Sequence, residues 1–171
     1  MACTISSNPV QLVPTSVDHV IHVADNMREI DVRELQAFRI TNVRNRLMSS
    51  YLVSDLCWTL LCEDVPVAIG GAAQIPGADG VGSPWFLATP TLELPAIRLA
   101  LAFRSMQAIR IIQERYARLE NWILADNVRT QSWLRWLGFW VSDPQDVEFA
   151  TERVCLIVRE REEEACVPPQ Q

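Results

Sequence analysis

Three acidic side chains in one short segment are the first groups in this sequence with types suited to acid–base chemistry. Glu29, Asp31 and Glu34 lie within six consecutive positions. A carboxylate at such a place can bind a cationic substrate or take a proton from it. The same spacing is also typical of the charged, solvated face of a short helix, and we favour that interpretation.

Histidine and cysteine were considered as metal ligands. His19 and His22 are three apart, the spacing of a helical ligand pair, but no carboxylate or cysteine pattern next to them completes a site. Both fall off the apolar face of their segment, so we expect exposed histidines. The cysteine count is odd and lacks C-x-x-C spacing, which predicts incidental thiols rather than zinc ligands or disulfides; the residues are Cys3, Cys57, Cys62, Cys155 and Cys166. We therefore expect no metal site.

Two arginines on the longest predicted helix form another candidate site. Arg104 and Arg115 are eleven residues apart, so at 100° per residue they point in the same direction. They could meet a phosphate or the acidic groups of a partner. Surface pairing with an acid one turn away is the alternative, and the sequence does not decide between the two.

Length, composition and charge set the class of protein. The 171 residues are 49% apolar and 21% charged, which is typical of a soluble globular protein. The net charge of −6 argues against direct nucleic-acid binding, because neutralising phosphates requires a surplus of cations. No apolar run approaches the roughly 20 residues of a membrane span, and the first residues lack the layout of a secretion signal. We expect no membrane association and a cytoplasmic location.

The first half of the chain predicts a strand at 10–14 followed by helices. Ser16 is expected to cap a helix whose apolar positions are Val17, Val20, Ile21 and Ala24. Further short helices are expected at 28–38 and 42–54.

A hairpin follows, with strands at 56–64 and 67–75 joined by a turn at Val65-Pro66. Glycine and proline predict a loop over 76–83, and 84–90 reads as the next strand.

The second half contains the longest predicted helix, 95–117. Its apolar face is expected to comprise Leu99, Ala102, Phe103, Met106, Ile109 and Ile112. Then come a strand at 120–126, a helix at 127–137, and strands at 139–141 and 151–160. This order predicts an α/β (α+β) fold with one mixed sheet and helices on both faces, because alternating elements cannot otherwise bury their apolar sides. Residues 1–160 are expected to form a single domain, and 161–171 a charged, flexible tail.

The stretch NVRTQSWLRWLGF, residues 127–139, carries a resemblance to a known family. In GNAT acyltransferases the last helix begins with Asn, has Tyr in its middle and ends in Gly-Phe. The corresponding residues here are Asn127, Thr130, Leu134, Gly138 and Phe139. The chain thus resembles the GNAT family over nearly its whole length, which implies a mostly antiparallel central sheet.

A closer resemblance is to the internal virion protein A family of short-tailed phages. It rests on Pro84-Trp85, on the helix 95–117, on Leu119 with Asn121, and on Trp136 or Trp133-Leu134 before Leu137-Gly138-Phe139. That resemblance implies a phage protein needed to build the interior of the virion, present in the host cytoplasm or packaged in the particle.

The GNAT resemblance also implies a mechanism and a set of site residues. In that family splayed central strands hold the pantetheine of acetyl-CoA, and a Gly-rich basic loop at the start of the long helix holds the pyrophosphate. If acetyl-CoA binds here, the resemblance assigns cofactor contacts to Phe86, Leu87, Ala88, Arg98 and Asn127. The acidic cluster would belong to the acceptor-side wall.

The sequence departs from the GNAT pattern at two chemical positions. The loop TPTLELPAIR, residues 89–98, has no glycine, two prolines that lack N–H groups, and Glu93 where diphosphate should lie. Leu134 stands at the position of the tyrosine that protonates the departing thiolate. We therefore expect a degraded acetyl-CoA site and leave the catalytic residues unassigned.

For Asn127 and the tryptophans, a structural role is the alternative to a role in binding. Asn127 is favoured as the N-cap of the last helix over a cofactor contact. Trp133 and Leu137 suit core packing, whereas Trp136 points elsewhere and suits an interface.

These features lead to one expected function and one alternative. The chain is expected to be a virion-morphogenesis or accessory protein that contacts a phage virion protein or a host protein, with no cofactor. The alternative is an active acetyl-CoA-dependent N-acetyltransferase that modifies or inhibits a host protein.

Overall fold

The structure, a computed structural model, describes residues 10–162, so most of the expected tail 161–171 lies outside the described residues. Seven strands form one sheet in the order β1-β2-β3-β4-β5-β7-β6. Their bounds are β1 Gln11–Pro14, β2 Leu56–Cys62, β3 Val65–Gln74, β4 Val81–Ala88, β5 Arg118–Leu124, β6 Trp140–Val141 and β7 Val154–Glu160. Only β4 and β5 pair in parallel, which confirms the predicted mixed, mostly antiparallel sheet.

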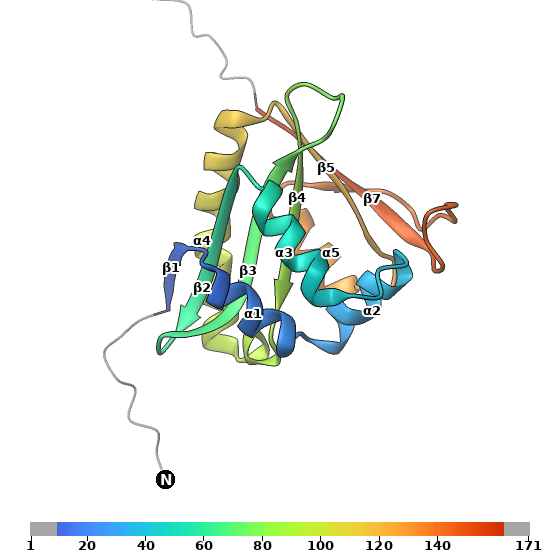
Figure 1. Ribbon diagram of the computed structural model, residues 1–171. Helices are drawn as coiled ribbons and strands as arrows, with labels where there is room; N and C mark the ends of the chain where they lie inside the picture. The colour runs from blue at the N-terminus through green and yellow to red at the C-terminus, as the bar shows by residue number, and fades with distance from the viewer. Residues whose placement is uncertain (1–9, 163–171) are drawn as a thin grey trace, which may run out of the picture.

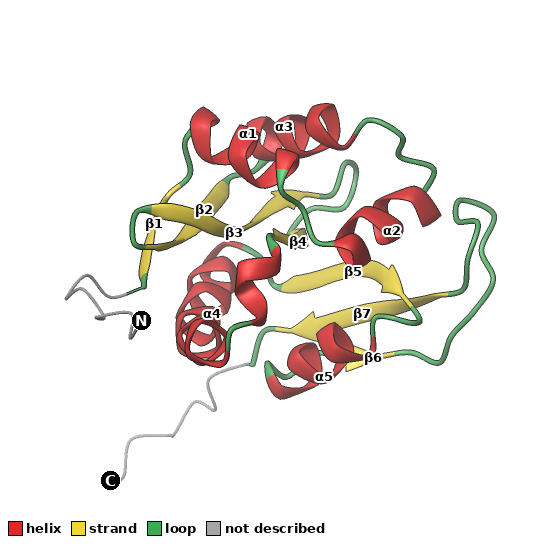
Figure 2. Cartoon of the chain, turned by 90° about the horizontal axis from the view of Figure 1, so that it is seen from below, coloured by secondary structure: helices red, strands yellow, loops and turns green. Residues whose placement is uncertain are grey.

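Helices cover both faces of this sheet, as predicted (Figure 2). The helices are α1 Val17–Asp25, α2 Glu29–Ala37, α3 Val43–Val53, the 3₁₀ helix η1 Pro90–Glu93, α4 Pro95–Arg115 and α5 Val128–Trp136. Figure 2 shows α1, α2 and α3 on one side of the sheet, and α4 and α5 on the other. Each layer encloses its own buried cluster, with Val20, Leu47 and Leu87 on the first side and Leu119, Ile123 and Leu134 on the second.

The predicted helix caps are confirmed. The Ser16 hydroxyl accepts a hydrogen bond from the His19 N–H at the start of α1, and the Asn127 side chain accepts one from the Thr130 N–H at the start of α5. Gly138 follows the end of α5 with φ of 84°, the left-handed conformation expected there. The last helix therefore stops where its sequence predicts.

The parallel pair β4–β5 is joined only at its beginning. Val81 pairs with Arg118 and Gly82 with Leu119, and beyond these positions the strands separate into a V (Figure 1). Pro84 lies two residues further along β4 and has no N–H to offer a neighbouring strand. The Asn121 side chain bridges the strands at this point by donating to the Pro84 carbonyl at 2.7 Å. The separation thus begins beside a residue that cannot continue the ladder.

The predicted hairpin turn at Val65-Pro66 was wrong by two residues. The turn is made by Glu63 and Asp64, with φ of 51° and 61°, and Val65 pairs with Cys62. Two-residue hairpin turns favour such positive φ values because their twist matches that of the strands. Pro66 is accommodated in β3 because it follows the pair Val65–Cys62 that closes the turn, and N–H directions alternate along a strand, so its nitrogen faces away from β2.

The predicted loop 76–83 was too long, because β4 begins at Val81. Gly77 and Gly80 make the turn with φ of 78° and 74°. Gly82 is instead a strand residue, and a Cβ there would lie 2.6 Å from the Tyr116 ring. A glycine is needed at this position because the Tyr116 ring approaches the backbone of β4 closely, and not because the chain turns there. At its other end β4 stops at Ala88, before the predicted end at residue 90, because Pro90 begins η1.

The predicted apolar face of the long helix was wrong for Leu99, Phe103 and Met106 and right for Ile112, which is buried, and Ile109, which packs against the core. Leu99, Phe103 and Met106 are 60%, 70% and 38% exposed, whereas Ile97, Ser105 and Ile112 are buried. The first half of the helix is rotated from the expected orientation, because it lies against η1 and β2 with Ile97 in the buried cluster. An apolar surface on α4 is left uncovered in the described structure.

We predict that Gly138→Ala destabilises the protein more than Gly77→Ala. Both residues have positive φ, but a Cβ at Gly77 meets open space, whereas one at Gly138 collides with the Arg159 guanidinium. That guanidinium is held by the Leu137 carbonyl and the Gln113 side chain. Gly138→Ala should lower the free energy of unfolding by about 1–3 kcal/mol more than Gly77→Ala, the usual cost of overpacking. Urea denaturation of both variants measures the difference, and equal losses would contradict this account.

Candidate functional site

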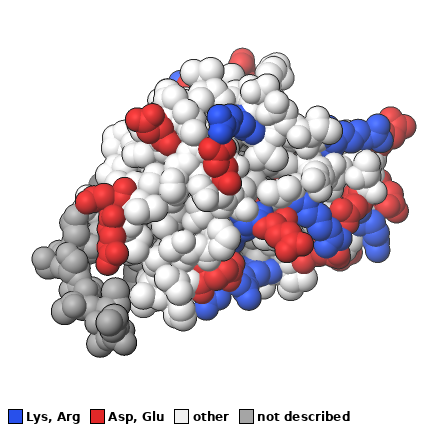
Figure 3. Space-filling view, turned by 60° about the horizontal axis from the view of Figure 1, so that its bottom comes forward, with Lys and Arg blue, Asp and Glu red and all other residues white. Residues whose placement is uncertain are grey.

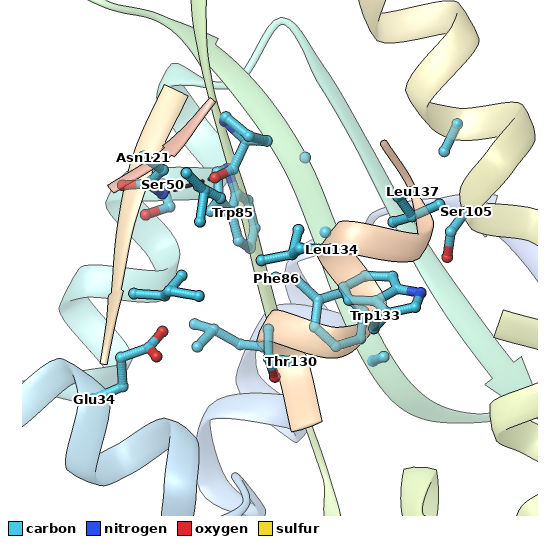
Figure 4. Close-up of a pocket in the computed structure, with 18 of the residues that line it drawn as sticks. Glu34, Ser50, Trp85, Phe86, Ser105, Asn121, Thr130, Trp133, Leu134 and Leu137 are labelled. Carbon is cyan, nitrogen blue, oxygen red and sulfur yellow. Dashed lines mark hydrogen bonds between the residues drawn. The ribbon is translucent and has the colours of Figure 1, made fainter. Parts of the chain in front are cut away.

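A cavity of about 490 Å³ runs through the V between β4 and β5 (Figure 4). Its walls come from helices on both faces of the sheet, so it passes from one side to the other. The α2 arm is lined by Glu34, Phe38, Ser50, Trp85, Trp122 and Phe149, and the α4 arm by Phe86, Leu101, Arg104, Ser105, Trp133 and Leu134. The volume lies in the range of small-molecule sites, about 300–1,000 Å³.

Two carboxylates of α2 hold the edges of the V apart. The Ala88 N–H at the end of β4 donates to Asp31 at 2.9 Å, and the Leu124 N–H at the end of β5 donates to Glu34 at 2.9 Å. Asp31 and Glu34 are three residues apart and therefore lie on one face of the helix. The helix thus supplies acceptors to strand edges that a continuous sheet would have paired with each other.

One backbone donor in the V remains for a ligand. N–H groups alternate in direction along a strand, so the Phe86 N–H points to the same side as that of Ala88, into the V. On the facing strand β5, the Trp122 N–H donates to the side chain of the preceding residue, Asn121, at 2.8 Å. The Leu124 N–H donates to Glu34. Along the open edges of the V, Phe86 is therefore the residue whose N–H faces the cavity.

A second donor comes from Trp133 on α5. Its indole Nε1 is buried and has no hydrogen-bond partner within residues 10–162. The ring packs against Phe86 with centroids 5.2 Å apart, and Figure 4 shows its nitrogen on the side of α4. A buried donor without a partner costs about 1–3 kcal/mol, and a ligand carbonyl in the α4 arm would satisfy it.

Glu34 is the ionisable group of the cavity with a strongly displaced pKa. Burial raises the pKa of its carboxyl from 4.5 to about 7, against the opposing hydrogen bonds from Leu124 and Asn127. The nearby Asp31 adds to the increase in this pKa and Arg28 reduces it. Both of these hydrogen bonds use Oε2, so within the described residues Oε1 is available to a ligand. Figure 4 shows the carboxylate directed into the cavity.

The start of α2 is fastened to β4 by a buried ion pair. The Arg28 guanidinium donates to both oxygens of Asp31, at 2.9 and 2.8 Å, and both residues are buried. The Arg28 N–H donates to the Ala88 carbonyl at 2.8 Å. Breaking a buried pair of this kind by removing one partner costs about 3–5 kcal/mol. These contacts place α2, and with it Glu34, at a defined position in the V.

A smaller charged pocket of about 370 Å³ adjoins the α4 arm and shares Phe86, Leu101, Thr130 and Trp133 with it. Arg28, Arg98 and Arg129 line it, and all three surround Glu93. Arg28 reaches Glu93 Oε1 at 3.4 Å, Arg98 lies 4.0 Å from Oε2, and Arg129 is paired with the same oxygen. The pocket already contains its own anion. On the face shown in Figure 3, acidic and basic side chains likewise stand side by side.

The structure separates the predicted cofactor residues, whose roles toward acetyl-CoA remain predictions. Phe86 presents its N–H to the V, Leu87 lines the same cavity and packs toward α1 and α3, and the Ala88 N–H is taken by Asp31. Arg98 lies in the charged pocket. Asn127 is 6% exposed, caps α5 and donates to Glu34 at 3.3 Å. Phe86, Arg98 and Asn127 thus line the charged pocket together, and Asn127 fulfils the expected capping role as well.

The acidic cluster was predicted to be a solvated face, and this was wrong for two of its three members. Glu29 is exposed, whereas Asp31 is 2% exposed and Glu34 is partly buried. The order of polar and apolar residues in so short a segment does not reveal which neighbour will cover it, and here β4 and β5 do.

The histidines and arginines that were candidate ligands in the sequence have other neighbours in the structure. His19 and His22 are half-buried rather than exposed, and the His19 ring shares a hydrogen bond with Thr59 at 3.1 Å. Arg115 forms an ion pair with Asp55 at 2.7 Å, and Arg104 lines the cavity. The two arginines therefore serve different neighbours.

The sequence interpretation disfavoured one residue of this site and missed another. Glu34 was named as a possible base but interpreted as a solvated acid, and Trp133 was interpreted as a core residue. The local feature that the sequence offers at Glu34 is Phe38, an aromatic residue four positions later and therefore about one turn away. No local signal marked the unpartnered Trp133 nitrogen, because its surroundings come from α4 and β4.

Within residues 10–162 no helix is long and apolar enough to cross a membrane. The same part of the chain contains no group of three or more His, Cys, Asp or Glu residues arranged to hold a metal ion.

No protein-family model and no curated protein matches the sequence. Solved structures do match. The aminoglycoside acetyltransferase AAC(6')-Ib, in complex with ribostamycin and coenzyme A, has a TM-score of 0.64 and 11% identity, over 90% of this chain and 94% of that one. The yncA protein of Salmonella typhimurium, with its cofactor acetyl-CoA, has a TM-score of 0.65 and 12% identity, over 95% and 100%.

An acetyltransferase of the GNAT family from Streptococcus pneumoniae has a TM-score of 0.59 and 10% identity, over 89% of this chain and 99% of that one. At these identities the likeness establishes the fold. The chain has a GNAT-like fold, as the sequence predicted, and the V between β4 and β5 is the part of that fold in which its cavity lies.

We predict that Glu34 makes the stability of the folded protein fall as the pH rises. Its folded pKa of about 7 lies above the unfolded value of 4.5, so its stabilising contribution is complete below pH 4.5 and is lost as the pH passes through 7. The Glu34→Gln variant lacks this titration. Its free energy of unfolding relative to the natural protein should increase by about 3 kcal/mol between these limits.

Urea denaturation across this pH range measures the difference, and Glu29→Gln, an exposed change on the same helix, is the control. A constant difference between Glu34→Gln and the natural protein would show that the Glu34 pKa is not raised.

Proposed function

We propose that the protein transfers an acyl group from a thioester donor such as acetyl-CoA to a small amine. The observation that carries this proposal is the position of Glu34, a carboxyl with a pKa of about 7 directed into a cavity that crosses the sheet. General bases are most effective when their pKa lies close to the working pH. Of the two functions expected from the sequence we therefore favour the active transferase, although Glu93 and Leu134 still depart from the GNAT pattern.

The residues of the α4 arm fit the pantetheine part of such a donor. Pantetheine carries amide carbonyls, and the arm offers the Phe86 N–H and the unpartnered Trp133 Nε1 as donors. The apolar walls formed by Leu101 and Leu134 match its aliphatic segments. The thioester supplies an activated acyl carbonyl, and the Phe86 N–H would orient its oxygen, which leaves Trp133 Nε1 as the donor to a pantetheine amide.

The charged pocket fits a diphosphate less well. Arg98, Arg129 and the start of α4 attract an anion, but Glu93 already occupies their centre, and Pro95 removes an N–H from the first turn. A diphosphate has to displace this carboxylate or share the guanidinium groups with it. We expect the donor to be held mainly by its pantetheine and acyl parts.

Glu34 Oε1 is the group that accepts the proton of the amine as its nitrogen bonds to the acyl carbon and the carbon–sulfur bond breaks. Leu134 cannot protonate the departing sulfur, and the Tyr116 hydroxyl is bonded to Asp55. A thiol ionises near about pH 8.5, so a thiolate can leave without a dedicated acid more easily than an alkoxide can. The missing tyrosine therefore lowers the rate without removing the reaction.

We predict that Glu34→Gln lowers kcat for acyl transfer by about 10²–10⁴-fold, the usual contribution of a general base. The amide keeps an acceptor for the Leu124 N–H, so the fold and the donor KM should change little. Release of free thiol from acetyl-CoA in the presence of an amine measures kcat, with Glu29→Gln as the matched control. Equal rates for Glu34→Gln and the natural protein would exclude Glu34 as the base.

A second candidate function is supported by the exposed face of α4. Leu99, Phe103 and Met106 are spaced i, i+4 and i+7 and form an apolar surface on that helix. Such a surface suits a protein partner. That the partner is a phage virion protein or a host protein, and that the chain acts in virion assembly, rests on the sequence resemblance alone.

We predict that Phe103→Glu abolishes co-purification of that partner from phage-infected cells and leaves acyl transfer unchanged. Residues at the centre of an interface contribute most of the binding free energy and residues at its rim contribute little, so a charge buried at the centre should prevent binding. Phe103 lies outside the residues that line the cavity, so the two functions are separable. Retained co-purification by Phe103→Glu would remove this surface as the contact.

A further inference from the structure

Rings from three distant segments form the outer wall of the α2 arm. Phe38 follows α2, Trp122 belongs to β5, and Phe149 lies in the segment before β7. Trp122 and Phe149 meet edge to face with centroids 5.4 Å apart, and Phe38 and Phe149 stack at 6.3 Å. All three line the same cavity as Glu34. Aromatic rings in this arrangement present both faces and edges to a further ring.

The Phe149 segment is held over the arm by two hydrogen bonds to residues at the end of α2, one from the backbone and one from a side chain. The Thr151 N–H donates to the Ala37 carbonyl at 2.8 Å, and the Arg39 guanidinium donates to the Glu148 carbonyl at 3.1 Å. Both contacts tie residues 148–151 to the C-terminal end of α2. Phe149 itself is 49% exposed, so it forms the rim of the arm rather than its floor.

The polar groups of the arm are few and mostly satisfied. The Asn121 side chain is bonded at both ends, to the Pro84 carbonyl and the Trp122 N–H. The Trp85 indole donates to Ser54 at 2.8 Å. Glu34 is the carboxylate lining this cavity, and Arg46 and Arg104, which also line it, are cationic. A ligand with one positive charge is therefore matched, whereas a ligand with several is repelled.

We propose that the acceptor bound in the α2 arm is a primary monoamine carrying one aromatic ring, with its nitrogen at Glu34 and its ring among Phe38, Trp122 and Phe149. The spacing within α2 supports this placement. Glu34 lies in the last turns of α2 and Phe38 is its C-cap four residues later, so the carboxylate and the ring wall are about one turn apart, and both line the cavity. The inference rests on the proposed function only in calling the amine an acyl acceptor. The amine-binding site itself is defined by the residues that line the α2 arm.

Binding without any thioester tests the site directly. Calorimetry at about pH 8, where Glu34 is largely ionised, compares 2-phenylethylamine with neutral 2-phenylethanol, with n-butylamine and with the trication spermidine. We expect 2-phenylethylamine to bind about tenfold more tightly than each of the other three, because only it satisfies both the carboxylate and the rings. Equal affinity for the alcohol, or tighter binding of spermidine, would overturn the proposal.

Matched variants locate the bound ring. Trp122→Ala and Phe149→Ala should each weaken 2-phenylethylamine binding about fivefold to tenfold. Phe149 is at the rim, so its variant keeps the core intact should Trp122→Ala fail to fold. Trp140→Ala is the control, because Trp140 is 61% exposed on β6 and does not line the cavity. Equal losses in all three variants would place the ring elsewhere.

Turnover separates this inference from the proposed function. Selective binding of 2-phenylethylamine without product from any acyl thioester would leave the site in place and remove the transferase. Acyl transfer to n-butylamine or spermidine with kcat/KM equal to that for 2-phenylethylamine would do the reverse, supporting the transferase and overturning the aromatic acceptor.

Discussion

The separation of β4 from β5 depends on where the N–H groups at their facing edges find acceptors. In a continuous parallel pair those groups would bond to the neighbouring strand, and an unpaired one in the interior would be destabilising. Here Asp31 and Glu34 accept from the ends of the two strands, and Asn121 accepts from Trp122. One helix, α2, therefore makes the V stable as an open structure.

The same contacts determine the electrostatics of the cavity. A carboxylate that must reach the edge of β5 is drawn into an apolar interior, and this desolvation raises the pKa of Glu34. The burial of the Asp31 carboxylate, three residues earlier, is compensated by an ion pair, because Arg28 donates to both of its oxygens. The proposed chemical role of Glu34 thus coincides with a structural one, since the residue that supports the end of β5 also lines the cavity.

The chain keeps the GNAT-like fold but departs from the GNAT sequence pattern at two chemically important positions. The loop before α4 lacks glycine and carries Glu93 among three arginines, and Leu134 cannot donate a proton. The V, its cavity and two donors that face it are nevertheless present among the described residues. Because function belongs to sites rather than to folds, the cavity and not the GNAT-like architecture carries the proposed transfer. The exposed apolar face of α4 is a separate feature of the molecule.

By itself, the sequence determined the order and type of the elements, the caps at Ser16 and Asn127, and the end of the last helix at Gly138. These depend on local properties such as periodicity, side-chain acceptors and φ, which neighbouring residues reveal. Only the tertiary structure decided which face of α4 is buried and whether the acids of α2 meet water. Leu99 and Ile97 are equally apolar, and Glu29 and Glu34 are the same residue type. Their different surroundings come from strands brought beside them by contacts across the sheet, and no pattern within one helix contains that information.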